Sequence, residues 1–195
     1  GLLVALIVPL VTMIKDRPLP VMAGQQTLRE ALHEACSHSG FWLLAFGFFV
    51  CGFQVVFIGV HMPSYLKDNG LSPQVAIYAL ALIGLFNVFG TYIAGTLGQR
   101  IPKRNILAFI YFARAVVISI FLLVPLSPLS VYVFSAVMGA LWLSTVPPTN
   151  AVVAQIFGVA HLSMLGGFVF FSHQIGSFMG VWLGGRLYDI YGNYT

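Results

Sequence analysis

Long apolar runs separated by short polar segments make up most of the chain. Five of these runs are long enough to cross a bilayer as helices, since a spanning helix needs about 20 residues. They are 41–66, 74–97, 106–125, 131–157 and 163–188. Within each run the apolar residues are continuous and do not alternate as they would on a membrane-spanning strand. The pattern therefore predicts an all-α integral membrane protein.

A shorter apolar run, 1–14, and a polar segment, 15–40, precede these spans. We expect 1–14 to be the end of a helix whose start is missing, because it is too short to cross a bilayer. Within the polar segment, Thr27 and Glu30 have the spacing of a helix capping box. Apolar residues then recur at helical spacing and predict a short amphipathic helix at the membrane interface.

Composition and charge support this interpretation. The chain of 195 residues is 59% hydrophobic and 7% charged, which excludes an ordinary soluble domain. Three basic residues lie in 15–40 and three more in the loop 98–105, against two on the opposite side, so both segments are expected in the cytoplasm, at the inner membrane. The net charge of +4 follows from these loops, and we expect no nucleic-acid partner.

The short basic loop after the second span carries a recognisable pattern, GTLGQRIPKRN, over 95–105. It resembles the signature G-x-L-x-D-R-x-G-R-[KR] of the major facilitator superfamily, in the degenerate form that follows helix eight. Gln99 stands at the Asp of that signature and Pro102 at its second glycine. The matching residues are Gly95, Leu97, Arg100, Lys103 and Arg104.

A second pattern, GRLYDIYG over 185–192, is similar to the ends of helix eleven in the same superfamily. It places Gly185 and Asp189 at the expected spacing. The resemblance implies the C-terminal six-helix bundle of such a transporter. Residues 1–14 would end helix six, 15–40 would form the central cytoplasmic loop, and 41–195 would hold helices seven to eleven, with helix twelve missing. The N-terminal half would be its partner.

Within the superfamily, residues 61–73 (HMPSYLKDNGLSP) resemble the helix-seven exit of the monocarboxylate and oxalate/formate branch. That branch often carries an Asp and an Arg one turn apart in helix eight. The corresponding positions here are Asn87 and Thr91, which are neutral, so the carboxylate site of the branch is not transferred directly.

Arg114 is the one charged residue deep within a predicted span, about 13 Å along the helix from Asn105. A buried charge in a bilayer is costly and needs a partner or an aqueous cavity. A guanidinium could hold a substrate carboxylate through two parallel hydrogen bonds. It could equally form a structural pair or extend toward the interface, and both interpretations remain open.

Other polar side chains within the spans are further candidates for substrate binding or coupling. His173 could act as a protonation switch near neutral pH or as a neutral hydrogen-bonding group between helices. Asn150 follows Pro147-Pro148, which are expected to break the fourth span and free backbone carbonyls, as helices lining a cavity often do. The alternative is an ordinary proline kink. Gln54, Asn87 and Gln174 are candidates that could line a cavity or join helices. His61, one turn before the outer end of the first span, could act as a gate, lie at the interface or bind substrate.

These features favour a secondary active transporter of a small organic anion such as a monocarboxylate, working by alternating access with proton symport or exchange. Arg114 would attract the anion, His173 would tune coupling, and the loop 95–105 would act as a cytoplasmic hinge or latch. An exporter of drugs or hydrophobic metabolites, and a non-transporting receptor or scaffold, are the alternatives. Without a nucleophile–base pair, metal cluster or phosphate-binding loop, the sequence predicts neither an enzyme nor a cofactor.

Overall fold

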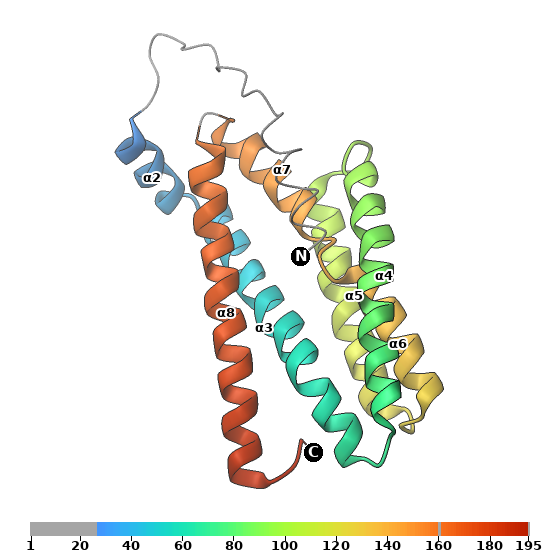
Figure 1. Ribbon diagram of the computed structural model, residues 1–195. Coiled ribbons are helices and arrows are strands. Elements are labelled where there is room, and N and C mark those ends of the chain that lie inside the picture. The colour runs from blue at the N-terminus through green and yellow to red at the C-terminus, as the bar shows by residue number, and fades with distance from the viewer. Residues whose placement is uncertain (1–26, 160, 195) are drawn as a thin grey trace, which may run out of the picture.

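The computed structural model describes residues 27–159 and 161–194, so the predicted segment 1–14 and residues 15–26 of the predicted linker lie outside the described residues. Within them the chain is helical and contains no strand. Its elements in order are α2 (Leu28–Ser37), α3 (Ser39–Asp68), α4 (Pro73–Leu97), α5 (Lys103–Leu123), α6 (Pro128–Leu141), α7 (Val146–Phe157) and α8 (Leu162–Tyr191) (Figure 1).

Among the described residues, five segments are long and apolar enough to span a membrane: α3, α4, α5, α6 together with α7, and α8. Their ends lie within a few residues of the ranges predicted from the sequence. The third span stops at Leu123 and not at Pro125, because Val124 is already extended (φ −85°, ψ 140°), as the residue before a proline prefers. The chain is a multi-pass, all-α membrane protein.

Two closely packed helix pairs form the bundle (Figure 1). α3 runs along α8, and α4 runs along α6, while α7 contacts α4, α5 and α8. Glycines let the backbones touch within each pair. A Cβ at Gly52 would meet the carbonyl of His173, and a Cβ at Gly90 would meet the carbonyl of Ala140, both well inside contact distance. Small residues at such crossings are the usual means of close helix packing in membranes.

Two apolar cores lie toward opposite ends of α3. One joins the last turns of α3 to α4 and α6 through side chains such as Leu66, Ile83 and Met138. The other joins the first turns of α3 to α2, α7 and α8 through side chains such as Phe48 and Leu165. Many large apolar side chains point outward, as expected for surfaces that meet lipid or another helical bundle.

The short helix α2 begins with the predicted capping box. The backbone N–H of Thr27 donates to Glu30 Oε2 at 2.8 Å, and the N–H of Glu30 donates to Thr27 Oγ1 at 3.3 Å. The hydrogen bonds from the Thr27 backbone and side chain lower the pKa of the Glu30 carboxyl. Ala31 and Ala35 on the apolar face are buried.

The fourth span is interrupted, but not at the prolines themselves. The unwound segment is Trp142–Thr145, which we call the break, and Pro147 and Pro148 lie in the first turn of α7. Proline has no N–H to donate to the carbonyl four residues earlier and its ring clashes with that carbonyl, so the disruption falls on the preceding turn. The first turn of a helix tolerates proline because its N–H groups have no intrahelical partner.

Candidate functional site: a polar cluster at the helix break

The break leaves two carbonyl oxygens at the end of α6 without their usual partners. In a continuous helix, Leu141 O would accept from residue 145 and Trp142 O from residue 146. Instead, the N–H of Val146 donates to Leu143 O at 3.0 Å. The carbonyls of Leu141 and Trp142 are thus available to side chains from elsewhere in the bundle.

The guanidinium of Arg114 in α5 donates hydrogen bonds to both carbonyl oxygens. Its Nη2 donates to Leu141 O at 2.5 Å and to Trp142 O, and its Nε donates to Leu141 O at 3.2 Å. The side chain is completely buried, and the Tyr111 ring centroid lies 5.7 Å from the guanidinium carbon. The carbonyl end of a helix carries partial negative charge, so the end of α6 compensates part of the positive charge of Arg114.

Asn87 of α4 binds a backbone N–H group of the break. Its Oδ1 accepts the backbone N–H of Leu143 at 3.0 Å and the hydroxyl of Thr91 at 3.3 Å. Asn87 and Thr91 therefore interact with each other. One of them also satisfies a backbone donor that the broken helix leaves free.

Cys51 of α3 and His173 of α8 complete the surroundings of the break. The Cys51 thiol is fully buried and lies 3.5 Å from Thr145 Oγ1. The side chains of His173 and Arg114 also lie within interaction range of this thiol. His173 is buried between Phe48 and the parallel ring of Phe170, with Nδ1 3.4 Å from Ser177 Oγ. We define the break cluster as Cys51, Asn87, Arg114, Thr145 and His173.

Two nitrogens of the break cluster have unused hydrogen-bonding capacity. Arg114 Nη1 and His173 Nε2 are buried and make no hydrogen bond to the residues the structure describes. Buried polar atoms are nearly always paired, so a water, the nearby Cys51 thiol or another polar group could complete the hydrogen bonding of either nitrogen. A carboxylate oxygen is a suitable partner for Arg114 Nη1, because a guanidinium only donates.

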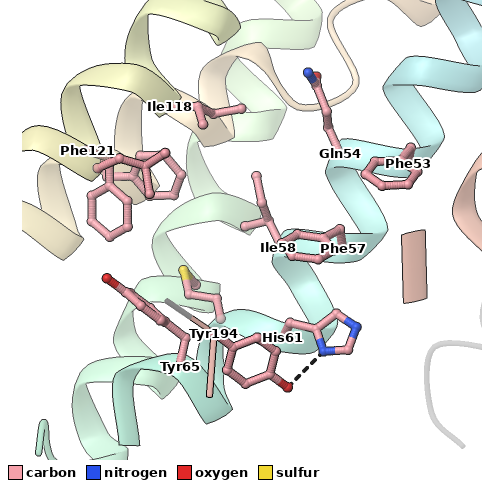
Figure 2. Close-up of a pocket in the computed structure, with 12 residues that line it drawn as sticks. Phe53, Gln54, Phe57, Ile58, His61, Tyr65, Ile118, Phe121 and Tyr194 are labelled. Atoms are coloured by element: carbon pink, nitrogen blue, oxygen red, sulfur yellow. Dashed lines mark hydrogen bonds between the residues drawn. The ribbon is translucent and has the colours of Figure 1, made fainter. Parts of the chain in front are cut away.

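A separate cavity of about 340 Å³ opens between α3, α5 and α6, and aromatic side chains form most of its wall (Figure 2). His61 lies at one end of it. Its Nε2 is 3.1 Å from Val181 O and must donate, since a carbonyl only accepts, so in the neutral ring Nδ1 accepts from the Tyr194 hydroxyl at 2.9 Å. The His61 ring therefore links α3 to α8 and to the segment that follows α8.

The remaining polar candidates lie outside the break cluster. Gln54 lines the aromatic cavity, and its Oε1 is buried without a partner among the described residues. Gln174 and Asn150 are exposed on the surface of the bundle. The structure thus brings Arg114, His173 and Asn87 to the break and leaves the other four predicted residues apart from it.

The predicted signature loop lies beside the start of α7. Residues Gly95, Gln99 and Lys103 face Pro147 and Pro148 across a cavity of about 280 Å³. The other residues of the signature, Leu97, Arg100 and Arg104, are exposed, as is Asp189 of the second pattern, whereas Gly185 is half-buried. The loop is therefore placed to contact the half-helix that follows the break.

Cys51 and Thr145 were not among the residues predicted from the sequence, nor was the pairing of Arg114 with α6. Helical spacing offered one signal for that pairing. Arg114 stands eleven residues past the first residue of α5, and Val146 stands eleven residues before the last residue of α7. Both helix ends face the same side, so the arginine and the break share one depth. Across the described ranges, no group of three potential metal ligands occurs.

Comparison with known proteins agrees with this architecture. The profile of the Major Facilitator Superfamily matches residues 1–192. An uncharacterised MFS-type transporter of Bacillus subtilis (strain 168), YcxA, is 27% identical over 176 residues. The aligned region covers 83% of this chain and 43% of that protein, so the chain spans less than half the length of the curated relative it matches.

Proposed function

The chain belongs to the major facilitator superfamily, and from that premise we propose that it forms part of a secondary transporter for a small organic anion. The transporter would work by alternating access, with proton symport or exchange. The family match supports a transporter and not an enzyme. The resemblance of residues 61–73 to the monocarboxylate and oxalate/formate branch supports a monocarboxylate-like substrate.

The observation that carries the proposal is the buried guanidinium of Arg114. Among the described residues its partners are carbonyl oxygens and not carboxylates, and Nη1 makes no hydrogen bond there. The acidic residues in the described part of the chain stand at or near helix ends, on α2, at Asp68 and at Asp189. A buried arginine of this kind is costly in a membrane and marks a path for a charged substrate. An anion reaching Nη1 would form a charge-assisted hydrogen bond.

Exposed polar side chains on the spans support a second bundle as partner. Gln174 and Asn150 lie within membrane-spanning helices and are exposed. Asn and Gln side chains in membrane-spanning helices form hydrogen bonds to neighbouring helices. We therefore assign the surface around them to contact with the N-terminal half, with the substrate path between the two. His173, near the middle of α8, is the group we assign to proton coupling.

The orientation follows from the basic loops. With 98–105 on the cytoplasmic face of the inner membrane, the turn between α3 and α4 and the end of α8 face outward. The signature loop beside Pro147 and Pro148 would then act as a cytoplasmic latch on α7. The aromatic cavity at the outer end gives specific support to a second candidate, an exporter of hydrophobic metabolites, because it is lined by apolar rings.

Counterflow in proteoliposomes containing the complete protein distinguishes these functions. We expect trans-acceleration of a labelled carboxylate such as lactate, and no uptake of its neutral counterpart lactamide. An exporter of hydrophobic compounds would move apolar solutes and ignore lactate. A receptor or scaffold would give no flux of any solute above protein-free vesicles.

A further inference from the structure

Side chains from three helices, α3, α4 and α5, contact the break. Arg114 of α5 binds the carbonyls of Leu141 and Trp142, Asn87 of α4 binds an N–H of the same turn, and Cys51 of α3 touches Thr145. The backbone of this turn is therefore satisfied by side chains that belong to other elements. The turn also has backbone hydrogen bonds of its own, from Trp142 N–H to Gly139 O and from Val146 N–H to Leu143 O.

Of these contacts, an anion would compete with the hydrogen bonds from Arg114 to the carbonyls of α6. The acceptors of Arg114 are neutral carbonyl oxygens, and Nη1 of the same guanidinium makes no hydrogen bond to the part of the chain that the structure describes. A carboxylate is a stronger acceptor than a carbonyl and matches the guanidinium fork with two parallel bonds. A carboxylate at Nη1 would compete with Leu141 and Trp142 for the remaining donors.

We propose that the break is a hinge which Arg114 holds closed, and that a monovalent carboxylate opens it by drawing the guanidinium away from the end of α6. This inference rests on the proposed function, because it takes the transported anion as the ligand. A single negative charge fits, since Arg114 is the one cation deep within the spans that the structure describes. Opening would free α7 to change its angle to α6, carrying Pro147 and Pro148 against the signature loop.

Cys51 provides a native reporter of this hinge. It is fully buried against Thr145, and Cys36 is the other cysteine of the 195 residues. In a Cys36→Ser background of the complete protein, alkylation of Cys51 by N-ethylmaleimide would be followed by mass spectrometry of its peptide. We expect sodium lactate to accelerate alkylation severalfold and lactamide to leave it unchanged.

Substitutions test separately whether Arg114 holds the break closed and whether a carboxylate opens it. Arg114→Lys keeps the charge but cannot bind both carbonyls through a fork, so Cys51 should react about tenfold faster without lactate, with little further response. Asn87→Ala removes one holding contact and leaves Arg114, so it should raise the basal rate and keep the lactate response. Arg186→Lys, on an exposed arginine of α8, should match the parent.

The results that would overturn the inference are distinct from those that would overturn the proposed function. Lactate counterflow with no effect of lactate on Cys51 would exclude the anion-operated hinge and leave the transport proposal standing. Unchanged alkylation in Arg114→Lys would exclude the lock whatever the substrate. If Arg114→Lys does not fold, an unchanged basal rate in Asn87→Ala would count against the hinge. If lactate counterflow is absent and Arg114→Lys speeds alkylation of Cys51, Arg114 does hold the break closed but a carboxylate is not the ligand that opens it.

Discussion

The guanidinium of Arg114 binds the carbonyl oxygen of Leu141 through two nitrogens, Nη2 at 2.5 Å and Nε at 3.2 Å. This contact places a charge from α5 on the open end of α6, at the depth where the fourth span is interrupted. It explains how a completely buried arginine is accommodated among apolar helices, since the helix end supplies both acceptors and partial negative charge.

Loss of the guanidinium fork should destabilise the bundle. In Arg114→Lys a single ammonium replaces a planar fork, so at least one carbonyl at the break loses its partner. We expect the free energy of unfolding in detergent to fall by roughly 1–3 kcal/mol, the cost of leaving a buried polar group unpaired. Arg186→Lys is the matched control and should change it little. Equal stability of the two variants would contradict the structural role of Arg114.

The glycine crossing between α3 and α8 should not accept a methyl group. A Cβ at Gly52 would collide with the His173 carbonyl, and one at Gly176 with the Phe49 carbonyl. Both obstacles are backbone, so the helices must separate, and Gly52→Ala or Gly176→Ala should cost roughly 1–3 kcal/mol in thermal unfolding experiments. Gly167→Ala, where nothing lies within 4 Å, should be neutral or slightly stabilising. A destabilised Gly167→Ala beside an unaffected Gly52→Ala would refute this packing.

The capping box of α2 should respond to acid. Because the folded pKa of Glu30 lies below its unfolded value, its contribution to helix stability is complete above the unfolded pKa. That contribution is lost as the pH falls through the lowered folded value. Carbon-13 NMR of the Glu30 carboxyl should give a pKa below the ordinary glutamate range, and Thr27→Val should raise it by removing the hydroxyl. A Glu30 pKa insensitive to Thr27→Val would argue against the box in solution.

The spans could be predicted from the sequence because continuous apolarity and helix length fix them. The partners of Arg114 could not be predicted in the same way. They depend on which helices meet and on carbonyls that a proline-induced break exposes one turn away. The same applies to Asn87, whose amide binds a backbone N–H 56 positions further along the chain. Asn150 had favourable local sequence beside the prolines, yet its place on the helix leaves it exposed.

His173 should control the pH dependence of transport. Its ring is buried, Nε2 makes no hydrogen bond to the described residues, and an imidazole nitrogen can accept and release a proton. In proteoliposomes, uptake by the parent protein should depend on the imposed pH gradient, and His173→Gln should flatten that dependence while retaining exchange at equal pH. His33→Gln, on α2 outside the spans, should behave as the parent. A pH profile that is unchanged in His173→Gln would remove the histidine from coupling.

Lactate counterflow by the complete protein and its Arg114→Gln and Arg186→Gln variants tests the central claim most directly. Arg114→Gln removes the buried charge while keeping a hydrogen-bonding side chain, whereas Arg186→Gln removes an exposed charge from α8. We predict that the parent and Arg186→Gln accumulate labelled lactate, and that Arg114→Gln, reconstituted to the same level, loses about tenfold or more of that rate. Undiminished lactate counterflow by Arg114→Gln would contradict the account.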